Sequence, residues 1–169
     1  TAAAQHDKRF ILNTVVSSKL PARIAAHYGV GFEQTLTGFK WLWNRALHRE
    51  AMGDRLVFAY EDAIGFSTTH RVRDKDGIAA AVSVVQMAQQ AKANRTTLGE
   101  KLNALYAQHG LAVNRQVSIN LDGEGGSTRM QAQLQGLRDT PPTELAGLAV
   151  TRFTDYAAAQ RFAPDGSHA

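Results

Sequence analysis

Short apolar runs and amphipathic helical patterns alternate over the first half of the chain. Apolar runs at 10–16 and 56–60 predict buried strands of ordinary length, and 30–34 is a short strand candidate between them. Between these runs, apolar residues recur with the 3.6-residue helical period at 20–28 and 39–52, and a glycine follows each segment. This alternation of strands and helices is typical of an α/β domain.

Two further helices are expected after the third strand. Residues 77 to about 93 follow a capping Asp76, and their apolar content is high enough that we expect this helix to be mostly buried. Thr96 or Thr97 caps the next helix, which ends at Gly110.

The pattern changes after residue 112. Alternating apolar residues predict a half-exposed antiparallel strand within 113–121, and a helix at 127–138 and a strand at 148–156 follow. These elements are too few to enclose a core of their own. We therefore expect a complete α/β domain at 1–112 and an incomplete α+β segment at 113–169.

Composition narrows the class of protein. The chain has 169 residues, 44% of them hydrophobic, which is enough to bury a core. It has no cysteine, so disulfides and cysteine-bound zinc are excluded. Because no apolar segment reaches about 18 residues, we expect no membrane partner and a cytoplasmic location. The net charge of +4 mildly favours anionic partners.

A carboxylate, Glu61, lies at the carboxyl end of the third predicted strand. Ligands of open α/β sheets collect at that edge. A carboxylate can accept hydrogen bonds from two vicinal sugar hydroxyls, and Gly65 would let the backbone approach such a ligand closely. Asp62 is adjacent to Glu61 and points in another direction, so the two cannot easily act as an acid and base pair. The alternative is an ordinary solvated turn.

A basic run at 70–77 precedes the amino terminus of the third predicted helix. Arg73 and Lys75 would favour an anion there, together with free backbone N–H groups. In the alternative interpretation, Asp74 and Asp76 neutralise these cations and the loop merely caps the helix.

Metal sites are not expected in this chain. The run 74–77 imitates part of an EF-hand, but that register places Val72 at the first ligand position and Ser83 where the bidentate glutamate belongs. The histidines lack metal-ligand spacing.

A second junction suited to a polar or phosphorylated ligand lies at 35–40. Here Thr37, Gly38 and Lys40 stand between a predicted strand and a predicted helix. The alternative is helix capping by Thr37.

These segments together resemble the third domain of the α-D-phosphohexomutase superfamily, which contains phosphoglucomutases, phosphomannomutases and phosphopentomutases. The motifs that carry the resemblance are Thr14-Val15-Val16-Ser17-Ser18, Thr35-Leu36-Thr37-Gly38-Phe39-Lys40-Trp41, Glu61-Asp62-Ala63-Ile64-Gly65-Phe66 and Asp74-Lys75-Asp76-Gly77. The match covers 10–112, and 113–169 looks like the start of the fourth, phosphate-binding domain. The fold expected is a three-layer α/β domain with a mixed sheet of about four strands between helices.

The resemblance implies an isomerase that interconverts a hexose or pentose 1-phosphate and the 6- or 5-phosphate. A phosphoserine gives its phosphoryl group to the sugar and takes it back from the other end through a sugar bisphosphate. In such enzymes the phosphoserine and the Mg²⁺ site belong to other domains, so no catalytic and no metal-binding residue is expected here.

The resemblance also implies a role for each candidate residue. Glu61 would accept the sugar hydroxyls, and Thr37, Gly38 and Lys40 would form the other ligand-facing junction. Lys75, and with it Arg73, would lie near the phosphate of the substrate.

There are three departures from the family pattern. The phosphoserine motif, the aspartate-rich metal loop and the phosphate loop are absent from this sequence, so we expect a fragment that is inactive without its missing domains. Ala63 stands where many members have serine, which resembles the branch that holds phosphopentomutases and some bacterial phosphomannomutases and leaves the sugar open. Trp43 replaces a small residue, without a functional account.

Two other functions compete with this one. A stand-alone module could bind phosphorylated sugars with the same loops and no catalysis. Nucleic-acid binding through 70–75 is disfavoured because no aromatic residues are interleaved with the cations.

Overall fold

A computed structural model describes residues 8–62, 64–114, 120–158 and 160–162. The chain divides into two compact units, Thr1–Arg115 and Gln116–Ala169. The assignment of 1–112 and 113–169 to two domains of a larger enzyme stays a prediction.

The first unit contains a four-stranded mixed sheet. Its strands are β1 (Arg9–Thr14), β2 (Gly31–Thr35), β3 (Arg55–Glu61) and β4 (Gly65–Ser67). They lie in the order β2-β1-β3-β4, with β1 parallel to β2 and β3 and with β4 antiparallel to β3. The predicted mixed sheet is confirmed, although β4 was not expected from the sequence.

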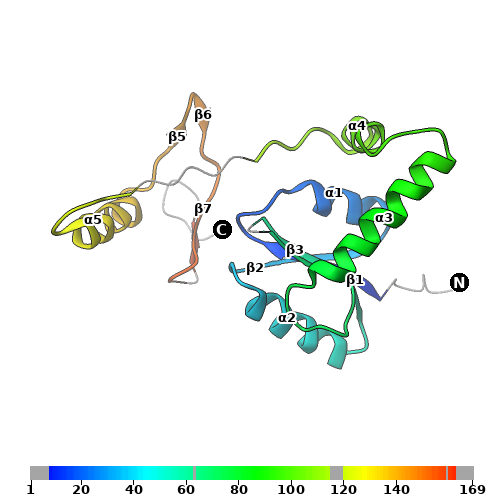
Figure 1. Cartoon of the computed structure of the whole chain (residues 1–169). Coiled ribbons are helices and arrows are strands. Elements are labelled where there is room, and N and C mark those ends of the chain that lie inside the picture. The colour runs from blue at the N-terminus through cyan, green and yellow to red at the C-terminus, as the bar shows by residue number, and fades with distance from the viewer. Residues whose placement is uncertain (1–7, 63, 115–119, 159, 163–169) are drawn as a thin grey trace, which may run out of the picture. The chain divides into compact units, whose positions relative to one another are not determined.

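Helices cover both faces of this sheet. They are α1 (Leu20–His27), α2 (Phe39–Ala51), α3 (Gly77–Ala93) and α4 (Leu98–His109). Figure 1 shows α2 on one side of the sheet and α1 and α4 on the other. The predicted three-layer α/β fold is therefore confirmed.

The core lies between the sheet and α2. Its buried members are Phe10, Leu12, Phe39, Leu42, Trp43, Ala46 and Ala59. Four of them lie on α2 at the positions that the helical period predicts to face inward. Leu47, which the same period placed on the apolar side, is exposed at the margin.

The expectation that α3 is mostly buried is wrong. Of its residues only Ala91 is buried, and Ile78, Val82 and Val85 are exposed. This helix packs against α4 and against β4, a three-residue strand at the margin of the sheet. A short marginal strand covers less of a helix than the broad face of a sheet would, and composition does not reveal which neighbour a helix finds.

Helix termini agree with the sequence at two places. Asp76 caps α3, because its Oδ1 accepts the N–H of Ala79 at 2.9 Å. Thr97 and Glu100 form a reciprocal capping box at the start of α4.

Within its described residues, the second unit contains one helix and two small antiparallel strand pairs. The helix is α5 (Gly126–Asp139), and the strands are β5 (Glu144–Leu145), β6 (Leu148–Ala149), β7 (Phe153–Asp155) and β8 (Gln160–Phe162). β5 pairs with β6 and β7 with β8, both antiparallel. Arg138 ties α5 to β7 through Asp155, with 2.6 Å between Nε and Oδ2.

Two strand predictions for this part need correction. The predicted strand at 148–156 is divided between β6 and β7, and residues 150–152 between them belong to no strand. Of the strand predicted within 113–121, residues 115–119 lie outside the described part, and 113, 114, 120 and 121 are not in a strand. Alternating apolar and polar residues indicate a half-exposed extended segment, but such a segment becomes a strand only if it pairs with a neighbouring strand.

None of the described helices combines the length and the apolar character needed to cross a bilayer. The cytoplasmic location stays a prediction.

Ion pairs fix α2 to the sheet at β2. Glu33 on β2 accepts hydrogen bonds from Arg45 Nε at 2.5 Å and from Arg49 Nη1 at 3.0 Å. Arg49 also contacts Asp54 Oδ2 at 2.6 Å. The hydrogen bond from Arg45 lowers the pKa of Glu33, against a smaller opposing effect of burial.

This lowered pKa predicts an acid-dependent loss of stability. Because the folded state lowers the pKa of Glu33, its ion pairs stabilise the fold above the pKa of the unfolded chain and cease to do so as the pH falls through the folded value. Urea unfolding at pH values from about 6 to about 3 should therefore show a smaller decrease in Glu33→Gln than in the parent. Glu50→Gln on α2 is the control and should keep the parental dependence.

Candidate functional site

Glu61 is the last residue of β3 and lies at the carboxyl edge of the parallel strands. It is only 5% exposed. Its Oε2 accepts the N–H of Gly38 at 3.1 Å, and its Oε1 lies 3.6 Å from Nζ of Lys75. The structure therefore brings together three of the predicted site residues. The alternative of an ordinary solvated turn is wrong, because the carboxylate is buried and paired.

Gly38 joins β2 to α2 directly beside this carboxylate. It is the N-cap of α2 and, as glycine, offers no side chain that could cap the helix. The alternative that Thr37 caps the helix is therefore wrong. Gly38 has φ +117°, in the left-handed region that side chains disfavour. The carboxylate of Glu61 acts on the amino end of α2, where a negative charge is favoured.

Gly65 is packed closely against the site. A Cβ atom there would lie 2.5 Å from Cε2 of Phe39 and 2.9 Å from Cγ of Glu61. The missing side chain makes room for the protein's own Phe39 and Glu61, and the close approach of a ligand at Gly65 stays a prediction. β4 can thus pair with β3 directly above the first residue of α2.

Lys75 supplies the cation of the site. Its Nζ lies 3.6 Å from Oε1 of Glu61 and 3.6 Å from Oδ1 of Asp74, and it stands 4.9 Å from the centroid of the Phe39 ring. Its side chain is 48% exposed. Asp74 does contact the cation and Asp76 does cap α3, as the alternative interpretation had it. The half-exposed ammonium nevertheless keeps donors that can turn to a ligand.

The other three predicted site residues lie apart from this contact. Thr37, Lys40 and Arg73 are exposed. Nζ of Lys40 lies 5.3 Å from the ring of Trp41. Among the described hydrogen bonds and ion pairs, none joins these three residues to Glu61.

A buried polar cluster beside the site was not predicted. Asn13 of β1 is fully buried and donates to the backbone O of Ser18 at 2.9 Å and to Tyr60 Oη at 3.2 Å. Gln34 Nε2 donates to Asn13 Oδ1 at 2.9 Å. Burial raises the pKa of Tyr60, and the hydrogen bond with Asn13 opposes this shift. In the sequence, the signal of this cluster was the amide of Asn13 within the largely apolar run 10–16.

This cluster fixes the ends of three strands. Asn13, Gln34 and Tyr60 lie near the carboxyl ends of β1, β2 and β3. Oγ1 of Thr14, the last residue of β1, lies 2.7 Å from Oγ of Ser17 in the connection that follows, and both residues are buried. The buried hydrogen bonds hold the edge of the sheet on which Glu61 stands.

Asp62 points away from Glu61, as expected for adjacent residues of an extended chain. Its Oδ2 accepts a hydrogen bond from Asn114 Nδ2 at 2.7 Å. The same amide donates to the backbone O of Val16 at 2.9 Å. Asp62 therefore anchors the end of the first unit, and Glu61 serves the candidate site.

A metal ion has no evident place here. In the described part of the chain, no group of three or more His, Asp or Glu side chains could hold one. The Mg²⁺ that the family resemblance implies thus finds no fitting donor set among these residues.

Comparison with known families and proteins gives consistent results. Residues 1–109 match the family model described as phosphoglucomutase/phosphomannomutase, alpha/beta/alpha domain III. The chain is 42% identical over 101 residues to a phosphopentomutase of Mus musculus, covering 60% of this chain and 16% of that protein. It is 39% identical over 106 residues to a glucose 1,6-bisphosphate synthase of Homo sapiens, covering 63% of this chain and 17% of that protein.

A bacterial relative matches more of the chain. A phosphoglucomutase of Staphylococcus aureus (strain MSSA476) is 29% identical over 148 residues, which cover 88% of this chain and 27% of that protein. The chain thus spans between 16% and 27% of the length of these relatives. A crystal structure assigned as a phosphomannomutase of Thermus thermophilus has a TM-score of 0.50 at 24% identity, over 63% of this chain and 22% of that one. This last likeness concerns the fold alone.

The tight packing at Gly65 makes a testable prediction. Gly65→Ala would force the added methyl group against Phe39 and Glu61 and should lower the free energy of unfolding by about 1–3 kcal/mol. Gly77→Ala is the matched control, because a Cβ at Gly77 meets no atom within 4 Å. Urea unfolding of both variants measures the difference. Equal stability of the two would contradict the proposed packing.

Proposed function

Since the chain belongs to the phosphoglucomutase/phosphomannomutase family through its domain III, we propose that it supplies the sugar-recognition surface of a phosphosugar mutase. The observation that carries this proposal is the buried carboxylate of Glu61, held by Gly38 and facing Lys75. We propose that the substrate is a hexose or pentose phosphate.

The free hydrogen-bonding capacity of Glu61 supports hydroxyl recognition. Oε2 is used by the N–H of Gly38, whereas Oε1 lies 3.6 Å from Lys75, beyond ordinary hydrogen-bond length. Each carboxylate oxygen has two lone pairs, so Oε1 can accept sugar hydroxyls without releasing Gly38. The contact with Gly38 also fixes the direction in which Oε1 faces.

Lys75 supports recognition of the phosphate group. Its ammonium carries three donors and is half exposed. Asp74 and Glu61 hold it loosely at 3.6 Å, so it can turn toward a phosphate oxygen at little cost. Thr37, Lys40 and Arg73 are exposed and are proposed as further contacts with the substrate.

The described residues bind and orient, and they supply neither nucleophile nor metal. Phosphoryl transfer depends on positioning and on charge stabilisation of the transferred group. In the proposed reaction, the phosphoryl group of an enzyme phosphoserine passes to the free sugar hydroxyl, and the resulting bisphosphate returns its other phosphoryl group to the serine. We assign the phosphoserine and the Mg²⁺ site to parts of the relatives that this chain does not match.

Substitution of the two central residues tests recognition. We expect Glu61→Gln to weaken binding of glucose 1-phosphate or ribose 5-phosphate by about tenfold or more, because a hydrogen bond to a charged group contributes about 1.5–3 kcal/mol.

Lys75→Ala should weaken binding of the same sugar phosphates and reduce the dependence of this binding on salt. Isothermal titration calorimetry of the 169-residue chain measures both. Lys92→Ala, an exposed lysine on α3, is the control, and unchanged affinity in Glu61→Gln would refute the role of this carboxylate.

Turnover by the chain alone tests the division of labour. Incubation of the chain with glucose 1-phosphate and glucose 1,6-bisphosphate should give no glucose 6-phosphate, measured with a coupled dehydrogenase assay. Measurable product that disappears in Glu61→Gln would show that this unit performs the chemistry itself. Binding without turnover, also in the presence of the remaining parts of a full-length protein, would favour a stand-alone binding module.

A further inference from the structure

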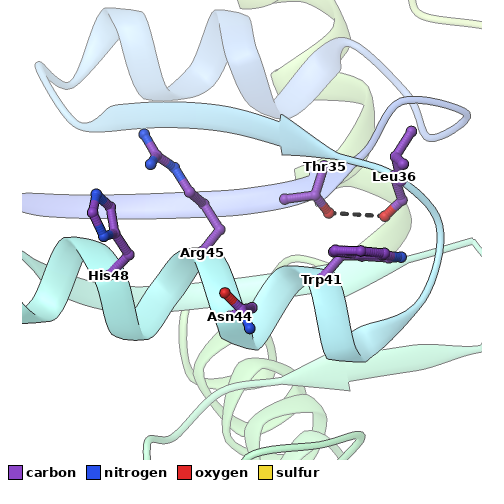
Figure 2. Close-up of a pocket in the computed structure, with 6 residues that line it drawn as sticks. All are labelled: Thr35, Leu36, Trp41, Asn44, Arg45 and His48. Atoms are coloured by element: carbon purple, nitrogen blue, oxygen red, sulfur yellow. Dashed lines mark hydrogen bonds between the residues drawn. The ribbon is translucent and has the colours of Figure 1, made fainter. Parts of the chain in front are cut away.

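A groove separate from Glu61 lies between the end of β2 and the first turns of α2. It has a volume of about 370 Å³ and is lined by Thr35, Leu36, Trp41, Asn44, Arg45 and His48. Figure 2 shows Trp41 beneath Thr35 and Leu36 at one end, Arg45 and His48 at the other, and Asn44 between them. The volume lies at the lower end of the range for small-molecule sites.

One end of the groove offers an aromatic surface. The side chain of Trp41 is 45% exposed, although α2 buries Trp43 two residues later. An exposed indole face can stack on the apolar face of a ring. Lys40, whose Nζ stands 5.3 Å from this ring, adds a positive charge nearby.

The groove is also lined by groups that can form hydrogen bonds with hydroxyls. The amide of Asn44 is exposed and can both donate and accept hydrogen bonds. Thr35 donates its hydroxyl proton to the backbone O of Leu36 at 2.9 Å, so its oxygen remains an acceptor. A sugar hydroxyl needs such a combination of donors and acceptors.

The far end of the groove holds a guanidinium and an imidazole, those of Arg45 and His48. The described hydrogen bonds of Arg45 to Glu33 use Nε and Nη2, at 2.5 Å and 3.1 Å. These bonds fix the guanidinium, and Nη1 takes no part in them. His48 is exposed one turn of α2 further along. Seven residues separate Trp41 from His48, which is about 10 Å of helix at 1.5 Å per residue.

We propose that this groove is a second ligand site, which binds a monosaccharide phosphate. The sugar ring stacks on Trp41, its hydroxyls bond with Asn44 and Thr35, and its phosphate lies against His48 and Arg45. This inference goes beyond the recognition role of Glu61, because the groove and that carboxylate share no lining residue. An open groove of this size predicts weak binding, with a dissociation constant of about 1 mM.

The two tryptophans of the chain allow a direct test. Trp41 is 45% exposed, whereas Trp43 is 4% exposed and its Nε1 is buried without a described partner. A ¹H–¹⁵N spectrum of the labelled chain should show two indole signals, and Trp41→Phe identifies which is which. Titration with ribose 5-phosphate or glucose 6-phosphate should move the Trp41 signal in a saturable manner and leave that of Trp43 in place.

Variants and competing ligands decide the outcome. Asn44→Ala and His48→Ala should each weaken the response at least several-fold, whereas Glu61→Gln should leave it unchanged even if it abolishes recognition at the other site. The proposal is overturned if the signal does not move at about 20 mM sugar phosphate, or if inorganic phosphate or AMP produces the same response at lower concentration. Loss of the response in Glu61→Gln would also overturn it, because the signal would then report the Glu61 site.

Discussion

The hydrogen bond from the backbone N–H of Gly38 to the carboxylate of Glu61 joins the two elements on which the candidate site depends. A carboxylate that is 5% exposed costs free energy unless it is paired. Here the partners are a backbone donor at the amino end of α2 and the ammonium of Lys75. The pairing requires β3, the β2–α2 connection and the loop before α3 to meet at one point, so the position of each constrains the others.

Core packing holds this meeting point in place. Phe39 directly follows Gly38 and belongs to the core between the sheet and α2. Its ring fills the space that Gly65 leaves empty, and Lys75 stands 4.9 Å from its centroid. The residues of the candidate site are therefore positioned by the core of the domain itself. A change that moves Phe39 would displace the donor to Glu61 and at the same time loosen the position of the cation, which ties the geometry of the candidate site to the stability of the core.

Features set by neighbouring residues in the chain were predicted from the sequence, whereas contacts between distant residues were not. The period of α2 and the strand ending at Glu61 follow from short-range patterns, and both are confirmed in the structure. The bond between Gly38 and Glu61 crosses 23 residues and depends on the strand order, which no short pattern encodes. The same limit explains why the exposure of α3 was not predicted. The composition of a helix does not show which elements it packs against. It also explains Asn13, whose partners Gln34 and Tyr60 lie on other strands.

The β2–α2 connection has two sides with different chemistry. On one side, the backbone N–H of Gly38 holds Glu61, and a side chain at that position would oppose the observed φ of +117°. On the other side, Thr35, Leu36 and Trp41 line the groove. At Gly38 the backbone alone therefore holds Glu61, and the flanking side chains of Thr35, Leu36 and Trp41 face the groove. Because Glu33 fixes Arg45 and Arg49 of α2 to β2, both sides of the connection rest on a helix that is held firmly against the sheet.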